Sequence, residues 1–595
     1  MSPLPSKHAF MHGTMRLQLI GVLLAILLVL LPWLSKLSPF ALSMLMQAAT
    51  YGIAVLGMVV VLGYTGQINL AQAAFFGFGA YSVALGTTVY GMGFWSALVL
   101  GVIIAALAGA VLGLTTLRLG GHYLAMITIS FQQIFDLVAV NWIAMTHGPD
   151  GVSGIGRPSL GPWLLSDDRA YLSLCFLVLV SMIALVAWLP YTRWGRAMCS
   201  VRENELAAEV VGVPTLRIKI GAFTLCAALG SVGGGLYAAG FAYISPDNFN
   251  FNRAIEFLSM VLLGGAQSPF GGVIGTTLLI LLPEWLKEMP KSLQFIKDFY
   301  LVIYGLAVIL IMVFMPQGIW GLLRSRFKPA PSAAPAATAL TLTANSSTPE
   351  VVLQLSGLSK FFGGLRAVDG INISVRRGMI HALIGPNGSG KTTTLNLICG
   401  LYRPTSGSIF FQEDDVTRTA PHQRAARGMG RTFQNIRLFS AMSVLENIMI
   451  GAQRSGNPIE RGEHALHQRA HAALAFVGLS DKYAETASQL PYGHQRLVEI
   501  ARSVAGYPSL LLLDEPAAGL NQTEKGELVE LLIRLRDDHG LTILLIDHDM
   551  RLVERVSDII TVLNFGKKIA EGTPAEVLKD PAVIAAYLGD DSGIS

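Results

Sequence analysis

Charged residues and cysteines are scarce in this sequence. Only 14% of its 595 residues are charged, whereas 52% are hydrophobic, which is too apolar a composition for a soluble enzyme of this length. The net charge of +4 is small for the size of the chain and does not indicate a nucleic-acid partner. The four cysteines show no paired spacing, so they predict neither a disulfide framework nor a zinc site. These absences predict a membrane protein with reduced, packed cysteines at Cys175, Cys199, Cys226 and Cys399.

The composition changes sharply near residue 328. Residues 1–327 contain repeated apolar runs of the length that spans a bilayer. Residues 328–350 are rich in Pro, Ala, Ser and Thr without periodicity, which is typical of a flexible linker. From 351 to 595, short β-branched runs alternate with helical patterns. We therefore expect a polytopic α-helical membrane domain followed by an α/β domain.

About ten membrane spans are expected. The first follows Lys7 and Arg16 but lacks a small-residue cleavage site, so we interpret it as a retained anchor rather than a secretion signal. The Gly/Pro-rich stretch 264–272 interrupts an apolar region, and we interpret it as a turn or a re-entrant corner. The predicted spans are 17–34, 40–62, 67–89, 94–116, 121–144, 170–189, 219–241, 256–268, 272–286 and 299–317.

Basic residues in short loops predict the orientation. The loop 190–219 is rich in arginine and is expected to be cytoplasmic, whereas the acidic loop 145–169 is expected outside. If 256–286 were a single span, the chain after the last span would lie outside, although its basic residues predict a cytoplasmic position. Both ends of the chain are therefore expected on the cytoplasmic side. The basic residues used are Arg193, Arg196, Arg202, Arg217, Lys219, Arg324, Arg326 and Lys328.

The strongest local signal is 385-GPNGSGKT-392, which follows the apolar run 382–384. It matches the G-x-x-x-x-G-K-[ST] phosphate-binding loop (P-loop) in the required strand–loop–helix context. The glycines let backbone N–H groups surround phosphate oxygens, Lys391 is expected on the β- and γ-phosphates, and Thr392 on Mg²⁺. The expected ATP-binding residues here are Gly385, Asn387, Gly388, Ser389, Gly390, Lys391, Thr392 and Thr393.

A second apolar run, 510-LLLLDEP-516, ends in two carboxylates. Buried strands avoid unpaired acids because burying them is costly, so a metal or base role is indicated. Asp514 suits Mg²⁺ ligation, directly or through water, and Glu515 suits activation of the attacking water.

Three further motifs narrow the class. They are 430-GRTFQNIRLF-439, 490-LPYGHQR-496 and 543-ILLIDHDM-550. With them, residues 351–595 resemble an ABC-transporter ATPase. The resemblance implies that Gln434 touches Mg²⁺ and water, that His548 contacts the γ-phosphate, and that Leu490 and Gly493 belong to the signature that completes the partner's nucleotide site. It also implies that Phe362 stacks on adenine, although a core aromatic residue fits the same spacing.

The signature departs from the family consensus Leu-Ser-Gly-Gly-Gln. Pro491 replaces Ser, Tyr492 replaces Gly and His494 replaces Gln. Pro491 supplies neither a hydroxyl nor an N–H group. One of two composite sites would then be weaker if this chain pairs with a different ATPase.

Residues 1–327 resemble the permease of branched-chain amino acid importers of the ABC family. The matching stretches include 62-LGYTGQINLAQAAFFGFGAY-81, 263-LGGAQSPFGGVIG-275 and 315-MPQGIWGL-322. The second half resembles the same family, notably at 490-LPYGHQRLVEIAR-502 and 580-DPAVIAAYLG-589. The short loops and the number of spans favour this importer over an exporter with six long helices.

Two features of the membrane half have alternative interpretations. The stretch 203-ENELAAEVVGV-213 predicts a short cytoplasmic helix, which the resemblance assigns as a coupling helix on the ATPase; a solvated loop is the alternative. The polar residues within spans either line a pathway or hold helices together. These are Gln67, Asn69, Gln72, Gln132, Gln133 and Asp136.

The sequence therefore predicts a fused half-transporter in the bacterial inner membrane, with its ATPase domain cytoplasmic. It would need a second permease and a second ATPase, either separate subunits or a second copy of itself, and a periplasmic binding protein that delivers a small solute. Branched-chain or related amino acids are the expected cargo. Urea, short amides or aromatic acids are the alternative; an exporter or an ATPase complex without cargo are the others.

Overall fold

The computed structural model describes residues 23, 25–34, 37–115, 122–161, 163–287, 317–324, 350–454 and 462–588, with isolated positions from 299 to 315. Parts of the predicted first and last spans lie outside the described residues, and so does the linker 328–350 apart from its last residue. Contacts divide the chain into two compact units. The first contains Met1–Arg202 and Leu216–Pro329; the second contains Glu203–Thr215 and Ala330–Ser595.

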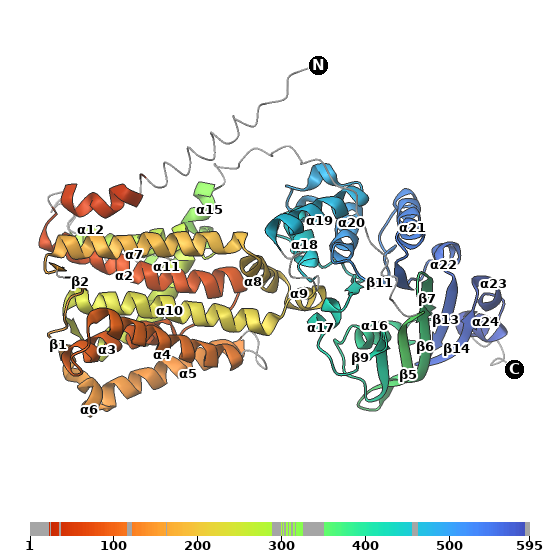
Figure 1. Ribbon diagram of the computed structural model, residues 1–595, viewed down its shortest axis with the longest axis horizontal. Coiled ribbons are helices and arrows are strands. Elements are labelled where there is room, and N and C mark those ends of the chain that lie inside the picture. Colours follow the sequence, from red (N-terminus) through yellow and green to blue (C-terminus); the bar gives the residue numbers. More distant parts are fainter. Residues whose placement is uncertain are drawn as a thin grey trace, which may run out of the picture. The chain divides into compact units, whose positions relative to one another are not determined.

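The first unit is a helical bundle (Figure 1). Six of its described helical stretches are long and apolar enough to cross a membrane, so the predicted total of about ten spans stays a prediction. The main helices are α2 (Pro39–Met58), continued by the π-helix η1 (Val59–Tyr64), α3 (Gln72–Thr88), α4 (Phe94–Thr115), α5 (His122–Asn141), α7 (Asp168–Trp188), α8 (Arg193–Glu203), α10 (Thr215–Phe241), α11 (Phe251–Gly264), α12 (Pro269–Lys287) and α15 (Gly318–Arg324).

Short elements connect these helices. They are α6 (Ile143–Thr146), the 3₁₀ turns η2 (Gly148–Asp150), η3 (Leu189–Tyr191) and η4 (Pro246–Phe249), and two small antiparallel pairs. One pair joins β1 (Val152–Ser153) to β4 (Tyr243–Ile244), and the other joins β2 (Ser159–Leu160) to β3 (Trp163–Leu164).

The Gly/Pro stretch 264–272 is a turn between two packed helices, as predicted. Helix α11 ends at Gly264 and α12 begins at Pro269. A Cβ atom on Gly264 would lie 1.8 Å from the Gly271 carbonyl oxygen, so only glycine permits this approach. Without a hydrophobic drive between helices in lipid, such close backbone contact supplies the packing energy.

The third predicted span begins later than expected. Residues 66–71 are not helical, and α3 starts only at Gln72. Gly66 has a φ of +70°, which interrupts the helical path. The predicted 67–89 boundary was therefore wrong by five residues at its start.

Several polar residues within the bundle hold helices together. The Gln72 amide donates to the Ala54 carbonyl at 2.6 Å. Gln132 is fully buried, accepts from the Ala74 N–H at 2.7 Å and donates to the Phe249 carbonyl at 2.7 Å. These bonds favour the packing interpretation for both glutamines.

Gln133 and Asp136 occupy a different position on α5. Gln133 is exposed in the described unit and Asp136 is half-buried, so neither is enclosed by the bundle that surrounds Gln132. For these two residues, lining a pathway stays open as an interpretation.

The second unit is built on two sheets (Figure 1). A six-stranded sheet has the order β10 (Met429–Arg431), β11 (Leu510–Asp514), β12 (Thr542–Ile546), β7 (Ile380–Ile384), β13 (Ile559–Asn564) and β14 (Lys567–Gly572), with only β14 antiparallel. The second sheet is antiparallel, with β6 (Leu365–Arg376), β5 (Val351–Phe362), β8 (Ser406–Phe411) and β9 (Asp414–Asp415).

Helices surround the six-stranded sheet. They are α16 (Lys391–Ile398), α17 (Pro421–Ala426), α18 (Val444–Ala452), α19 (Glu463–Phe476), α20 (Tyr492–Val504), α21 (Gln522–Asp537), α22 (Met550–Val556), α23 (Pro574–Val577) and α24 (Pro581–Leu588), with 3₁₀ turns η7 (Ser480–Lys482) and η8 (Ala487–Gln489). Every residue of β7, β11 and β12 is buried, which explains their continuous apolar sequence. Because parallel strands end at one edge, the residues after these three strands gather there.

A buried histidine in β7 makes the stability of the second unit depend on pH. Burial lowers the pKa of His381 to about 4, and its Nε2 lies 2.8 Å from the Thr561 hydroxyl. A histidine in the unfolded chain takes up a proton near pH 6.5. The unfolded state therefore binds more protons between these values, and stability falls as the pH falls through this window, by up to about 3 kcal/mol.

Calorimetry of the full chain tests this expectation. The unfolding transition of the second unit is identified as the one whose temperature rises when ATP is added. Between pH 6.5 and 4, that transition should move down more steeply in the wild-type chain than in His381→Gln, whose amide does not titrate. Equal slopes in the two proteins would contradict the assignment.

Candidate functional site

The P-loop joins β7 to α16 and is held by its own lysine. Lys391 is buried, and its Nζ donates to the carbonyls of Gly385 at 2.7 Å and Pro386 at 2.9 Å. Gly390 precedes α16 with a φ of +100° and without a side-chain cap, so the first N–H groups of the helix stay available. A loop with these free donors and a buried cation suits phosphate.

Close packing explains two of the P-loop glycines. A Cβ atom on Gly385 would lie 2.1 Å from the Leu563 carbonyl oxygen, and one on Gly390 would lie 2.3 Å from the Ala367 carbonyl oxygen. Among the other predicted residues, Ser389 is buried. Asn387, Gly388 and Thr392 are exposed and Thr393 is half-buried, so these four are accessible to a ligand.

Gln434 and His548, which were predicted from separate motifs, both contact the carboxylate of Glu515. Glu515 directly follows β11, with a φ of +48°, and its N–H donates to the Ile546 carbonyl at 2.7 Å. Its Oε1 lies 2.7 Å from His548 Nε2, and its Oε2 accepts from the Gln434 amide at 2.9 Å. The strained backbone turns this carboxylate away from the strand and toward both side chains.

Asp514, the neighbouring acid, is buried at the end of β11. Its Oδ2 lies 3.4 Å from an Arg431 guanidinium nitrogen, and its Oδ1 is buried without a hydrogen-bond partner among the described residues. Burial raises the pKa of the Asp514 carboxyl, and Arg431 opposes that shift. The same burial lowers the pKa of Lys391, against the opposing influence of Glu515 and Asp514.

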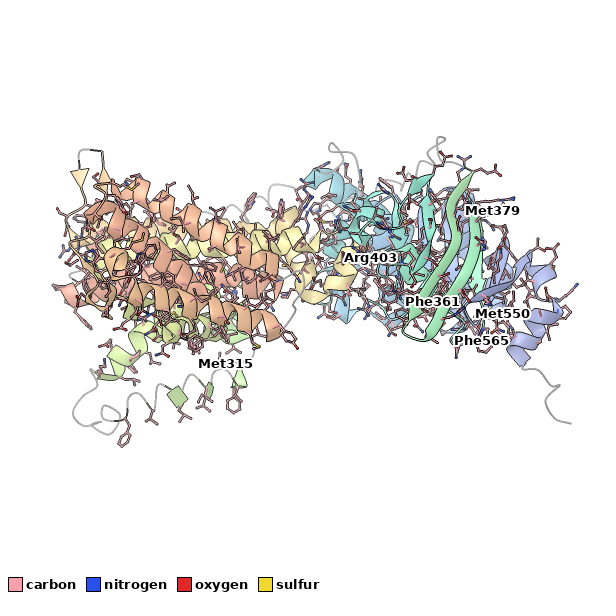
Figure 2. All side chains as sticks on the ribbon, turned by 90° about the horizontal axis from the view of Figure 1, so that it is seen from below. Met315, Phe361, Met379, Arg403, Met550 and Phe565 are labelled. Atoms are coloured by element: carbon pink, nitrogen blue, oxygen red, sulfur yellow. The ribbon has the colours of Figure 1, made fainter. Side chains whose placement is uncertain are left out.

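The predicted adenine contact lies at the tip of the β5–β6 hairpin. Phe362 follows Phe361, which Figure 2 labels on β5, and its exposed ring meets Tyr402 edge-on with centroids 5.5 Å apart. Lys360 lies 5.0 Å above the same ring. The next strand passes beside the P-loop, because Ala367 limits the space at Gly390. An exposed aromatic face is thus present near the phosphate loop.

The altered signature forms the start of α20. Pro491 is the residue before the helix, and Leu490 is buried. A Cβ atom on Gly493 would lie 2.4 Å from a Glu524 carboxylate oxygen, and one on Gly519 would lie 2.8 Å from the Tyr492 ring. Pro491 is compatible with its place before α20, because an α-helix does not pair the backbone N–H group of the residue that precedes it.

A short helix from the 190–219 loop belongs to the second unit. As predicted, residues 203–213 contain a helix, α9 (Glu205–Val211), which starts after Asn204 and ends at Gly212. The Asn204 side chain accepts from the Ala207 N–H at 2.9 Å, and Gly212 has a φ of +110°. These are the N-cap and C-cap residues that such a helix requires. The preceding helix α8 was not predicted.

The segment is held by buried alanines and valines of α9 and by polar contacts. Glu203 accepts from the Ala441 N–H at 3.3 Å, and Arg437 donates to the Asn204 side chain at 3.5 Å. Glu209 lies 3.8 Å from His422 on α17. The segment therefore contacts the stretch that follows Gln434 as well as α17.

Sequence reasoning missed a group of buried charges beside Gln434. Arg496, Glu499 and Arg502 on α20 are fully buried and bond to one another and to the backbone of 433–437. Their spacing of three residues places them on one helical face, which is the signal that could have drawn attention to them. Their partner lies more than 60 positions away in sequence, so the contact itself could not be predicted.

Comparison with known families assigns both units. Residues 40–314 match the family described as "Branched-chain amino acid transport system / permease component". Residues 368–518 match "ABC transporter", and residues 567–592 match "Branched-chain amino acid ATP-binding cassette transporter".

Individual relatives match one unit each. The branched-chain amino acid transport ATP-binding protein BraF of Pseudomonas aeruginosa is 42% identical over 250 residues, covering 40% of this chain and 98% of BraF. LivG of Escherichia coli is 43% identical over the same extent. The permease protein LivM of Salmonella typhimurium is 31% identical over 329 residues, covering 51% of this chain and 76% of LivM. Thus the two units resemble proteins that are separate chains elsewhere.

Proposed function

Because the chain belongs to the branched-chain amino acid family of ABC transporters, with the permease and the ATP-binding part on one polypeptide, we propose that it imports branched-chain or related amino acids. It is a membrane protein whose ATPase binds ATP and couples its hydrolysis to transport. The observation that supports this proposal most is that both halves match components named for the same kind of cargo.

The catalytic roles follow from the carboxylate of Glu515. Glu515 accepts the proton of the attacking water, because its carboxylate lies at the end of β11 beside the P-loop. His548 and Gln434 fix the two carboxylate oxygens at 2.7 and 2.9 Å in this structure. In the ATP-bound state, they contact the γ-phosphate and the water, respectively. Lys391 then exchanges its P-loop carbonyl partners for the β- and γ-phosphates.

The remaining residues of the site hold the nucleotide. The backbone N–H groups of 385–393, with the Ser389 side chain, surround the phosphates, and the exposed ring of Phe362 stacks on adenine.

The residues around Asp514 fit Mg²⁺. The unpaired, buried Oδ1 of Asp514 needs a partner that a hydrated cation supplies, and Thr392 and Gln434 add the oxygen ligands that Mg²⁺ prefers. If bound there, Mg²⁺ would neutralise negative charge on the phosphates of the nucleotide. Arg431 keeps Asp514 aimed at this position by holding its other oxygen.

The site requires a partner. In the working complex, the start of α20, which follows the buried Leu490 and contains Gly493, faces the nucleotide of a second ATPase. A second permease completes the membrane part. These partners are separate subunits or a second copy of this chain. Pro491 leaves the composite site that it serves without the consensus serine hydroxyl, so that site should hydrolyse ATP more slowly.

The direction of transport and the location are further parts of the proposal. A periplasmic binding protein delivers the amino acid, the membrane is the bacterial inner membrane, and the ATPase faces the cytoplasm. The segment 203–213 acts as the coupling helix, because its contacts reach the stretch that follows Gln434. Movement of the ATPase would then switch the permease between outward and inward states.

Reconstituted uptake tests the proposal. The full chain is purified with its co-purifying partners, placed in vesicles, and supplied with ATP on the side of the ATPase and with labelled leucine plus the partner binding protein on the other. We expect ATP-dependent accumulation that excess isoleucine or valine abolishes and urea or benzoate does not. Competition by urea or benzoate would show that the transported solute belongs to one of those classes instead. ATP-driven flux in the opposite direction, or hydrolysis without flux, would refute import.

A further inference from the structure

Three charged residues on α20 form a buried cluster, here called the α20 triad: Arg496, Glu499 and Arg502. All three side chains have no solvent exposure. An Arg496 guanidinium nitrogen lies 2.9 Å from Glu499 Oε2, and an Arg502 nitrogen lies 3.6 Å from Glu499 Oε1. Burying three charges is expensive, and apolar residues of similar volume often serve stability as well or better. The triad therefore calls for an explanation other than stability alone.

The remaining hydrogen bonds of the triad go to the backbone of residues 433–437. Arg496 donates to the carbonyls of Phe433 at 2.6 Å and Gln434 at 2.7 Å. Arg502 donates to the Arg437 carbonyl at 2.7 Å. Apolar replacements would leave these carbonyls without the donors they have in this structure.

Glu499 binds the same stretch from the acceptor side. Its Oε1 accepts from the N–H groups of Phe433 at 3.4 Å and Arg437 at 3.2 Å. Five bonds thus fix the two ends of a five-residue loop, and Gln434 inside it, to one face of α20. Such a loop has little freedom to move unless α20 moves with it.

Two side chains of this loop contact functional parts of the second unit. On one side the Gln434 amide reaches Glu515 at 2.9 Å. On the other side the Arg437 side chain reaches Asn204, before α9. The helix that carries the triad begins at Tyr492, within the signature. The triad therefore lies between the signature, the carboxylate and the segment 203–213.

We propose that the α20 triad positions Gln434 for ATP hydrolysis, by fixing the backbone of 433–437 to the helix that carries the signature. A displacement of the signature end of α20 then moves the Gln434 amide relative to Glu515. Through this connection, binding of a partner's nucleotide to the signature changes the position of the Gln434 amide beside Glu515, the hydrolytic carboxylate of this chain. The proposal rests on the ATPase activity and is independent of the cargo and of the direction of transport.

A double-mutant cycle tests the proposal in the full chain, purified in its assembled complex. Arg496→Met should lower kcat by about tenfold or more and leave the KM for ATP within about twofold, because a displaced catalytic group slows turnover while the P-loop is untouched. Arg496→Lys, which can still reach one carbonyl, should recover part of kcat.

The decisive variant adds Gln434→Ala. If Arg496 acts through Gln434, the double variant Arg496→Met/Gln434→Ala should have the kcat of Gln434→Ala within about twofold. Multiplying losses would overturn the proposal, as would a rise in KM equal to the fall in kcat. Arg469→Lys is the matched control, because Arg469 is a buried arginine of the same unit whose guanidinium lies over the Tyr507 ring, away from the loop. It should lower thermal stability without changing kcat.

Hydrogen exchange keeps the proposal testable if Arg496→Met fails to assemble. In Glu499→Gln, which keeps the shape of the side chain, the N–H groups of Phe433 and Arg437 lose their charged acceptor. Their exchange should accelerate by about tenfold or more relative to the amides of β11. Unchanged exchange at these two amides would show that the triad does not hold the loop.

Discussion

In Glu515→Gln, ATP hydrolysis should fall by about 10²–10⁴-fold while ATP still binds. The amide cannot take the proton from water, yet it has the size of the carboxylate and can still bond to His548 and Gln434. The Glu515 N–H bond to Ile546 and the strained φ belong to the backbone, so the substitution should leave the loop in place. Uptake driven by this site should be lost.

Steady-state hydrolysis, equilibrium ATP binding and vesicle uptake together check this expectation. Glu554→Gln serves as the control, because Glu554 is exposed on α22 in the same unit. Hydrolysis at the wild-type rate would mean that another group activates the water. Uptake that continues after hydrolysis by this site has stopped would mean that the second ATPase of the complex suffices.

Lys391→Ala should act one step earlier, by abolishing ATP binding to this chain. The substitution removes the cation of the phosphate site and both bonds from Nζ to the P-loop carbonyls of Gly385 and Pro386. The loop then loses both the positive charge that complements the phosphates and the hydrogen bonds that hold its own backbone. We expect affinity for ATP to fall by at least about 10²-fold, which corresponds to about 3 kcal/mol.

Thermal melting gives a direct measurement of that loss. Ligand at about 100 times its Kd stabilises a folded protein by about 2.7 kcal/mol, so MgATP should raise the melting temperature of the wild-type second unit but not that of Lys391→Ala. Lys579→Ala, at an exposed position, should keep the full shift. A normal shift in Lys391→Ala would remove this lysine from the nucleotide site.

Local sequence predicted the parts of this chain whose chemistry is local. The P-loop needs glycines and a lysine within eight residues, and the break at 264–272 needs only Gly and Pro, so both could be located before any fold was known. The helix α9 was equally predictable, because Asn204 and Gly212 cap it from within the same segment.

Other features depend on distant partners and could not be predicted. Arg496 meets Phe433 across 63 positions, and Arg502 meets Arg437 across 65. In the membrane part, the start of α3 at Gln72 depends on the backbone path through Gly66. Apolar composition marks 67–71 as part of a span but says nothing about that path.

The segment 203–213 clusters with the second unit, although it lies between two helices of the first unit in sequence, and this has a consequence for a fused chain. If it acts as the proposed coupling helix, separate subunits would have to meet through this one short segment, at a rate that depends on their concentration. On one polypeptide the encounter is unimolecular, with an effective concentration of about millimolar. Under the proposed coupling role, the contact could therefore release and re-form without loss of the ATPase to the surrounding pool. Covalent linkage also fixes one motor to each permease, whatever the relative expression of competing ATPases.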